Sequence, residues 1–335
     1  MTTFEAAMNQ EFIANKLKRE LRFLFPLLSD PNVTDIHRNP DGRIWIEYQG
    51  LEKELCQETL TDAEVLTLVG TIASGAGTTI NPKRPQMDAT LPWGQRFHCF
   101  TSPVTDAPSF SIRNHSARLF SLNDYVSSGR MTAEVKEHIR TFIRKRENII
   151  ISGGTGSGKT TLTNAILLEL KNIHPKHRLC VMEDTRELVI HNDDVVQEKA
   201  CEYASMRDLL AGNLREKPDR IIMGEIRGAE AHDLLKTWNT GHPGGISTVH
   251  ANSAYSALAR FEQLVLEAEN LNIPYLRSLI ADAVNVVIHI ERRPGIGPVV
   301  AEVLKIDHML GSDGRYKGIP VYKLPDFEDE LLSSD

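Results

Sequence analysis

The 335-residue sequence lacks any apolar run of the length that a membrane-spanning helix needs, which is about 18 residues. Its longest apolar segments, 148–152 and 283–290, have the length of strands. We therefore expect any contact with a membrane to be peripheral.

Paired cysteines are also missing. The four cysteines, Cys56, Cys99, Cys180 and Cys201, form no C-x-x-C pair, which argues against a zinc ribbon and against a disulfide framework. The first twelve residues have neither the basic segment nor the apolar segment of an export signal. These features predict a cytoplasmic protein.

The sequence has no excess of positive charge. Its 38 Lys and Arg residues face 45 Asp and Glu residues, which leaves a net charge of -7. A dedicated nucleic-acid-binding protein normally has a basic excess, so we expect no direct binding of nucleic acid. Apolar residues make up 41% and charged residues 25%, as in ordinary globular proteins, and the length suggests roughly two domains.

Residues 1–118 predict a smaller α+β domain at the N-terminus. An amphipathic helix is expected over 6–25, where Pro26 would end it, and a second helix over 62–73. Four segments have the alternating pattern of strands: 33–37, 43–48, 96–101 and 109–113. The first helix has a basic face, Lys16, Lys18, Arg19 and Arg22, which suits an anionic membrane or a partner, although a solvated face is the commoner situation.

The rest of the chain predicts an α/β domain. Residues 119–130 contain Ser127-Ser128-Gly129 and suggest a linker. In residues 131–325, apolar strands alternate with helices, which indicates a parallel-rich sheet covered on both faces. Residues 326–335 hold five acidic residues and predict a flexible acidic tail.

Residues 153–160 read GGTGSGKT and satisfy the phosphate-binding pattern G-x-x-x-x-G-K-[ST]. They follow an apolar strand and precede an apolar-periodic helix, as this pattern requires. Backbone N–H groups of such a loop surround a β-phosphate at the helix N-terminus, Lys159 reaches the β- and γ-phosphate oxygens, and Thr160 binds Mg²⁺. The residues expected to bind ATP are Gly153, Gly154, Thr155, Gly156, Ser157, Gly158, Lys159, Thr160 and Thr161.

A second apolar strand, 220–223, is followed by Gly224 and Glu225. In phosphate-loop NTPases, the acid after such a strand acts on Mg²⁺ or on the attacking water. Gly224 stands where the commoner pattern has an aspartate. Glu225 is thus the best candidate for the general base, and a plain surface glutamate is the alternative.

Three acids, Glu183, Asp184 and Glu187, follow the apolar strand 179–182. The carboxyl ends of parallel strands form the edge at which α/β folds bind ligands. One of these acids could orient Mg²⁺ through water, but the spacing does not decide which. Acids at this kind of position also cap helices.

Two histidines, His242 and His250, flank a glycine-rich turn. Eight residues apart and without a cysteine partner, they make a poor zinc site. Their place at a strand boundary suits hydrogen bonds to a γ-phosphate or to the catalytic water. A structural role for one of the two is the alternative.

Four segments occur in a characteristic order: GGTGSGKT, MEDTREL, IIMGEIRG and TGHPGGISTVHANS. They resemble the Walker A, Asp box, Walker B and His box of bacterial type II and type IV secretion ATPases. The string LREKPDRIIMGEIRGAEAHDLLKTWNTGHPGGISTVHANS resembles the type IV branch, and its conjugative-transfer members in particular. The resemblance covers most of residues 84–291, and it implies a RecA-like phosphate-loop domain and a homo-hexameric ring.

The resemblance extends to LPWGQR at 91–96 and SIR at 111–113. It implies that Arg96 and Arg113 contact phosphates as arginine fingers do, whereas pattern alone would make them ordinary strand arginines. The family often has LRxRPDR where this chain has Glu216-Lys217, so the role of a second basic residue there stays open. The four-cysteine metal module of type II members is not in the sequence.

The function implied by the resemblance is Mg²⁺-dependent ATP hydrolysis that drives type IV secretion or conjugative DNA transfer through domain motion in a ring. In this scheme Glu225 orients water, and His250 with Arg113 senses or stabilises the γ-phosphate. The implied partners are inner-membrane secretion-channel proteins, with peripheral contact at the inner face of that membrane. Two alternatives stay open: a pilus or type II secretion motor, and an ATP-binding switch or scaffold with little turnover, which Gly224 suggests.

Overall fold

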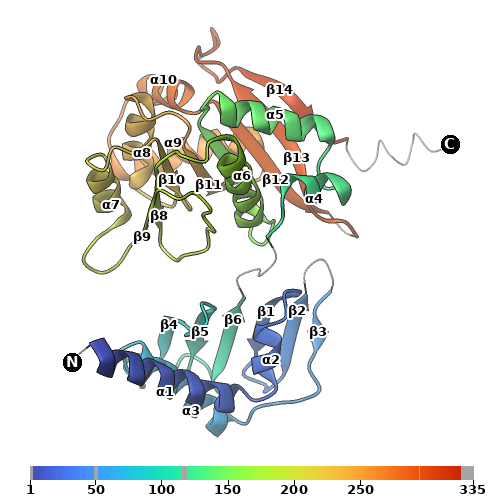
Figure 1. Cartoon of the computed structure of the whole chain (residues 1–335), viewed down its shortest axis with the longest axis vertical. Helices are drawn as coiled ribbons and strands as arrows, with labels where there is room; N and C mark the ends of the chain where they lie inside the picture. The colour runs from blue at the N-terminus through green and yellow to red at the C-terminus, as the bar shows by residue number, and fades with distance from the viewer. Residues whose placement is uncertain (1–2, 49–51, 115–118, 294, 326–335) are drawn as a thin grey trace, which may run out of the picture. The chain divides into compact units, whose positions relative to one another are not determined.

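The computed structural model describes residues 3–48, 52–114, 119–293 and 295–325 (Figure 1). The chain divides into two compact units, Met1–Arg118 and Leu119–Asp335, and each is described by itself. The predicted acidic tail, 326–335, lies outside the described residues.

The first unit is an antiparallel sheet with helices packed on it, and the predicted α+β class is confirmed. Its strand order is β3-β2-β1-β6-β5-β4. The strands are β1 (Val33–Arg38), β2 (Ile44–Tyr48), β3 (Glu54–Leu55), β4 (Gln86–Thr90), β5 (Arg96–Phe100) and β6 (Ser109–Arg113). The helices are α1 (Thr3–Leu21), α2 (Leu24–Leu28) and α3 (Asp62–Gly75).

The helix predicted over 6–25 is wrong at its C-terminal end. Helix α1 stops at Leu21, because Arg22 has a φ of 51° in the left-handed region, and α2 starts at Leu24. Pro26 lies inside α2, near its N-terminus, where a helix tolerates proline. Strands β3 and β4 were not predicted either.

The second unit is built on an eight-stranded sheet in the order β14-β13-β12-β7-β11-β10-β8-β9. The run from β12 to β9 is parallel, whereas β13 and β14 are antiparallel. The strands are β7 (Ile149–Gly153), β8 (Leu179–Glu183), β9 (Val195–Lys199), β10 (Arg220–Met223), β11 (Ile246–His250), β12 (Val286–Arg293), β13 (Gly297–Ile306) and β14 (Gly318–Lys323). The predicted parallel-rich sheet is confirmed.

Helices cover both faces of this sheet because its central strands are apolar on both sides. Ile149 and Ile151 face one core, while Ile150 between them faces the other. The first core includes α4 (Leu122–Ser127), α5 (Ala133–Arg144) and α6 (Lys159–Ile173). The second includes α7 (Met206–Asn213), α8 (Glu230–Asn239), α9 (Ala254–Ala268) and α10 (Ile273–Ala283).

Residues 119–130, expected to be a linker, are instead a packed part of the second unit. The side chain of Ser121 accepts a bond from the Asp124 amide, and the Ser121 amide donates to the Asp124 carboxylate, so the segment starts a helix with a capping box. Phe120, Leu122 and Tyr125 are buried in the same core as α5 and α6. The linker prediction was wrong because it relied on the serine and glycine content of this segment.

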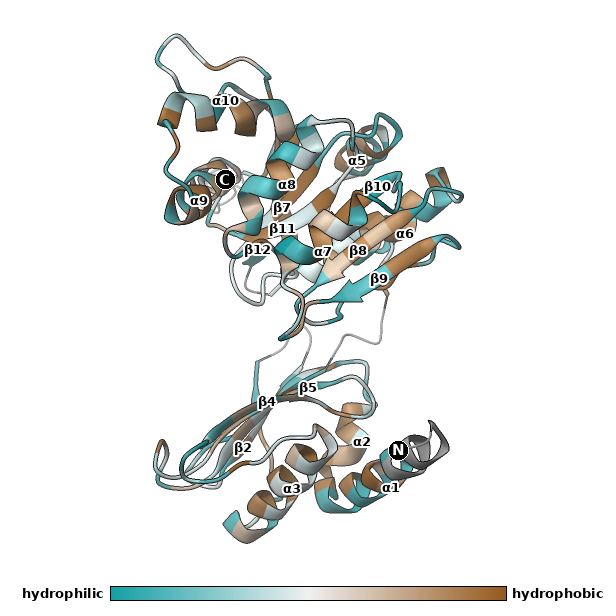
Figure 2. Cartoon of the chain, turned by 90° about the vertical axis from the view of Figure 1, so that its left-hand side faces the viewer, coloured by the Kyte–Doolittle hydropathy of each residue, from teal (hydrophilic) through white to brown (hydrophobic). Residues whose placement is uncertain are grey.

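The ends of the central strands fall at one edge of the sheet. Gly153 at the end of β7 lies opposite His250 at the end of β11, and Met223 of β10 lies opposite Met182 of β8. The segments predicted to carry chemistry therefore leave the sheet side by side (Figure 2). Among the described residues, no helix combines the length and the apolarity that crossing a membrane requires.

Candidate nucleotide-binding site

The loop between β7 and α6 has the backbone of a phosphate-binding loop. Gly158 has a φ of 93°, and a Cβ there would lie 2.9 Å from Pro298 Cβ, so glycine is required on two grounds. A Cβ at Gly153 would collide with the carbonyl oxygen of Ile290. The glycines of the motif thus fit a loop that folds tightly onto the sheet.

The loop also has unused donors that fit an anion. Helix α6 begins at Lys159, and its N-cap, Gly158, supplies no side-chain bond to the first amides. Ser157 is only 4% exposed, and among the described residues its Oγ has no hydrogen-bond partner. A helix N-terminus with free N–H groups attracts phosphate. The residues present therefore fit a nucleotide phosphate.

Lys159 points into this loop. Its Nζ donates to the carbonyls of Gly153 at 2.9 Å and Gly154 at 2.8 Å, and it lies 3.1 Å from His250 Nδ1. Burial lowers the pKa of Lys159 to about 8, and Glu225 opposes this effect. The ammonium group is thus already positioned for phosphate, at the cost of partial desolvation.

Glu225 and His250 continue from Lys159 as a chain of contacts. His250 Nε2 lies 2.8 Å from Glu225 Oε1, and the other carboxylate oxygen lies 2.6 Å from Arg227 Nη2. Burial is the main cause that lowers the pKa of His250, and the nearby Lys159 charge adds to it. The structure therefore brings three predicted residues together: Lys159, His250 and Glu225.

Thr160 is paired with one acid of the predicted Asp box. Its Oγ1 donates to Glu187 Oε2 at 3.1 Å, so the predicted Mg²⁺ ligand and this carboxylate lie side by side. Thr161 follows in the first turn of α6 and is half-buried, and Thr155 is exposed in the loop. Among the three candidate acids, Glu187 is thus the one that contacts Thr160.

Glu183 has a structural role instead. It is 2% exposed, and its Oε1 accepts bonds from the amides of Glu187 and Leu188, both at 2.8 Å. Its Oε2 accepts a bond from Gln197 on β9 at 3.0 Å. Burial raises the pKa of Glu183. This carboxylate fixes the loop that carries Glu187.

The glycine at position 224 has a steric cause. A Cβ at Gly224 would lie 3.0 Å from Cγ of the buried Glu183. An aspartate, as in the commoner pattern, would crowd that side chain. Glu183 thus occupies part of the space that a side chain at position 224 would need.

His242 lies at the other edge of the sheet, so its predicted place beside the phosphates does not hold within one chain. Its turn precedes β11, and the amides of Gly244 and Gly245 donate to Asn148 Oδ1 at 2.7 and 2.9 Å. The turn comes before Ile246, the first residue of β11, whereas His250 is the last residue of that strand. A strand of five residues spans about 16 Å.

Arg96 and Arg113 lie in the first unit, directly opposite each other on β5 and β6. Like charges opposite each other destabilise a sheet. Asp35 on β1 offsets one of them, because its Oδ1 lies 2.8 Å from Arg113 Nε. The predicted pair thus lies side by side on two neighbouring strands of this sheet.

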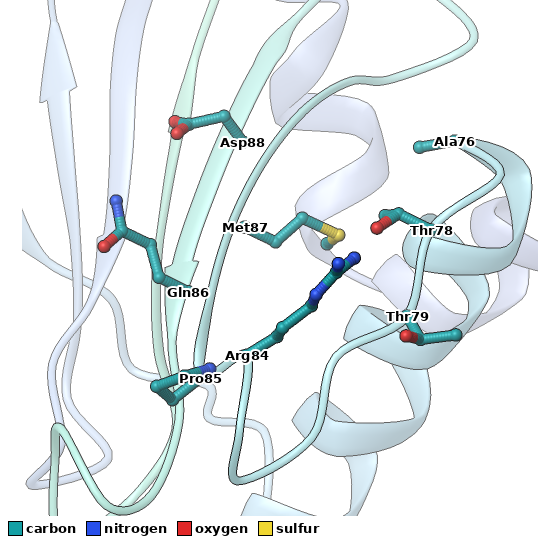
Figure 3. Close-up of a pocket in the computed structure, with 8 residues that line it drawn as sticks. All are labelled: Ala76, Thr78, Thr79, Arg84, Pro85, Gln86, Met87 and Asp88. Atoms are coloured by element: carbon teal, nitrogen blue, oxygen red, sulfur yellow. The ribbon is translucent and has the colours of Figure 1, made fainter.

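The first unit also contains a cavity of about 510 Å³ beside β4 (Figure 3). Arg84, Met87 and Asp88 line it together with Thr78 and Thr79. These residues belong to the first unit and the phosphate loop to the second, so we assign the two features separately.

Sequence reasoning missed Arg227 and Gln197. Arg227 contacts Glu225 and lies 3.5 Å from Asp184 Oδ2, and Gln197 contacts Glu183. The position of Arg227, two residues after the predicted base, was a usable signal. Gln197 had none, because strand β9 was not predicted.

Residues 18–293 match the protein family described as type II/IV secretion system protein. A protein of Sinorhizobium fredii, described as "Probable conjugal transfer protein TrbB", is 40% identical over 291 residues, which are 87% of each chain. The conjugal transfer protein TrbB of Rhizobium radiobacter is 41% identical over 281 residues, 84% of this chain and 85% of that protein.

Two solved structures share the fold. The pilus retraction motor PilT with bound ADP has a TM-score of 0.61 at 18% identity and covers 94% of this chain and 85% of its own. The ATPase DotB of Legionella pneumophila has a TM-score of 0.60 at 21% identity, covering 93% and 83%. The predicted RecA-like fold is thereby confirmed. Because the family match spans most of the sequence and relatives reach 40% identity, the chain belongs to the type II/IV secretion system protein family, in its type IV secretion branch.

Proposed function

We propose that this protein is a Mg²⁺-dependent ATP hydrolase that powers a conjugative type IV secretion apparatus. The observation that carries the proposal is the chain of contacts from Lys159 through His250 to Glu225 at the edge where the phosphate loop leaves the sheet. The conjugal transfer proteins at 40% and 41% identity support the cellular role.

The chain's own residues divide the work. The loop amides and Lys159 bind the phosphates, and Ser157 offers its buried hydroxyl to the same anion. Glu225 orients the attacking water and accepts its proton, and His250 keeps that carboxylate in place. Catalysis of phosphoryl transfer is mostly positioning and electrostatics, which suits a site built from fixed charges.

Thr160 is the residue that would hold Mg²⁺, and Glu187 orients it through their hydrogen bond. Mg²⁺, when bound, neutralises charge on the β- and γ-phosphate oxygens. Asp184 stays a second candidate for contact through water. Glu183 is excluded from this role in our proposal because its oxygens already accept bonds from backbone and Gln197.

The remaining parts of the proposal concern assembly. Arg96 and Arg113 supply positive charge during turnover, and the subunits form a homo-hexamer whose domain motion follows the nucleotide cycle. The ring works at the inner face of the inner membrane with secretion-channel proteins, and it contacts no nucleic acid itself. The net charge of -7 supports the absence of direct nucleic-acid contact, and the conjugal transfer relatives support the link to a secretion apparatus.

The first test compares Lys159→Ala and Glu225→Gln with the wild-type protein. Phosphate release should fall below detection in Lys159→Ala and by about 100-fold or more in Glu225→Gln, because each removes a charge used in the transition state. Glu225→Gln should still bind ATP, measured by equilibrium titration. Circular dichroism checks that both variants fold.

The alternative of an ATP-binding switch gives a different result in the same assay. Equal, slow phosphate release by wild type and Glu225→Gln would favour the switch and reject the hydrolase. A pilus motor is the other candidate, because the fold also resembles PilT. Co-purification with pilin-assembly proteins in place of conjugation-channel proteins would favour it.

A further inference from the structure

We propose that Arg227 is a positioning residue that holds Glu225 in a resting state and frees it by moving to Asp184. The inference rests on the proposed role of Glu225 as the base. We call this arrangement a latch: Arg227, in the loop between β10 and α8, pairs either with Glu225 or with Asp184.

The guanidinium group lies between these carboxylates. Its Nη2 is 2.6 Å from Glu225 Oε2, and its Nη1 is 3.5 Å from Asp184 Oδ2. Glu225 follows β10 and Asp184 follows the neighbouring β8, so both come from the edge that holds the phosphate loop. In this structure the guanidinium group of Arg227 therefore lies closer to Glu225 than to Asp184.

The backbone of Arg227 is fixed while its side chain is accessible. The amides of Arg227 and Gly228 both donate to Glu230 Oε1, at 2.7 and 2.8 Å, at the start of α8. The side chain of Arg227 is 54% exposed. The guanidinium can therefore change partner by side-chain rotation, without movement of the strand or the helix.

The carboxylate of Glu225 is held on both sides in this arrangement. His250 lies 2.8 Å from Oε1, and Arg227 lies 2.6 Å from Oε2. A general base must direct an oxygen lone pair at the water proton, and the cation Arg227 on the carboxylate weakens it as a proton acceptor. Removal of this charge should therefore make Glu225 a better base.

Arg227 is the partner of Glu225 that can leave. His250 lies 3.1 Å from Lys159 of the phosphate loop, whereas Arg227 makes no hydrogen bond or ion pair to that loop among the described residues. Side chains of Asp184 and Arg227 are 44% and 54% exposed, and ion pairs this exposed are weak. A small change at the site is enough to move the guanidinium to Asp184.

The test is a double-mutant cycle read by single-turnover hydrolysis of ATP. Arg227→Ala should raise the hydrolysis rate about two- to fivefold, the range of an exposed ion pair, and leave the KM for ATP unchanged. Asp184→Asn should lower the rate, because it removes the second position of the latch. In the double variant, the Asp184→Asn effect should vanish.

Two further variants serve as controls for the effect of Arg227→Ala. Arg227→Gln should repeat the result of Arg227→Ala if the alanine variant folds poorly. Arg207→Ala is a matched control, because Arg207 on α7 is 45% exposed and pairs with Asp233 on α8 at 2.5 Å. This control should leave the hydrolysis rate within error of wild type.

Three results would overturn the latch. Loss of hydrolysis in both Arg227 variants would make Arg227 a group that the chemistry needs. An Asp184→Asn defect of equal size with and without Arg227 would mean that Asp184 acts independently. Unchanged rates in the Arg227 variants would mean that the ion pair has no influence. If the proposed function fails instead, wild type and Glu225→Gln hydrolyse ATP equally, which separates the two failures.

Discussion

The two edges of the second unit's sheet use polar side chains in different ways. At the carboxyl edge, the carboxylate of Glu225 lies between His250 and the partly exposed Arg227, and His250 also lies against Lys159. At the amino edge, Arg220 is 1% exposed and donates to the carbonyls of Ile143 and Gly244, at 2.8 and 2.9 Å, and it has no ion pair with an acid among the described residues.

The same strands therefore have a ligand-binding end, at the carboxyl edge, and a structural end, at the amino edge. A buried arginine bonded to carbonyls has one arrangement, and burial lowers its pKa to about 10. The carboxyl edge offers several competing partners for each charge, so its side chains can rearrange when a ligand binds. The amino edge thus stabilises the positions of the strands, whereas the side chains of the carboxyl edge can change their contacts.

The largest expected effect on stability is at the amino edge. Arg220→Ala would remove the donor from the Gly244 carbonyl and from His177 Nδ1, while the Ile143 carbonyl would keep its bond from the Arg146 amide. We expect a loss of about 3 to 5 kcal/mol in the free energy of unfolding, measured in urea. Lys159→Ala should show a much smaller loss. Equal losses in the two variants would contradict the division between the edges.

Much of the carboxyl edge could be predicted, because its residues follow directly from strands. Lys159, Glu225 and His250 each stand at a fixed step from an apolar segment, and parallel strands bring such steps together. The contacts of Glu183 could not be predicted, since they depend on which rotamer fills the space between neighbouring loops. The role of His242 stays a prediction, although its place before β11 puts it at the amino edge.

In the fold, the errors have local physical causes. Helix α4 was hidden in a segment rich in serine and glycine, although Ser121 and Asp124 have the spacing of a capping box. Strand β9 is half exposed at the edge of the sheet, so its sequence shows no strong apolar pattern. Interior strands were predictable because burial on both faces requires continuous apolar residues.

A smaller effect on stability is expected for Asn148→Ala at the amino edge. Asn148 donates to the Ala283 carbonyl at 2.7 Å and accepts from the amides of Gly244 and Gly245. Loss of these buried bonds should cost about 1 to 3 kcal/mol of unfolding free energy. Nucleotide affinity, measured by titration calorimetry, should stay within a factor of about two because the site lies at the other edge.

The carboxyl edge should instead respond to pH. Since the pKa of Lys159 is lowered to about 8, its ammonium form falls as pH rises above that value in the free protein. Phosphate binding favours the charged form, so ADP affinity should fall as pH rises from about 8, and binding should take up a proton. Calorimetry in two buffers of different ionisation enthalpy measures that uptake.

Glu225→Gln sharpens this pH test. The Glu225 charge raises the pKa of Lys159 against the effect of burial. Its removal should therefore move the fall in affinity to lower pH. A fall that starts at the same pH in both proteins would mean that another group controls binding.

The smallest expected effect distinguishes the two histidines. His242→Ala should leave ADP affinity of a single copy within a factor of about two, because His242 lies in the turn before β11, at the amino edge. His250→Ala should weaken turnover by about 10-fold or more, because His250 contacts both Lys159 and Glu225. Affinity is measured at protein concentrations low enough to give monomers, checked by mass photometry. A His242→Ala defect that appears only in the assembled ring would assign the turn before β11 to contacts between subunits, whereas a defect in the monomer would contradict its place at the amino edge.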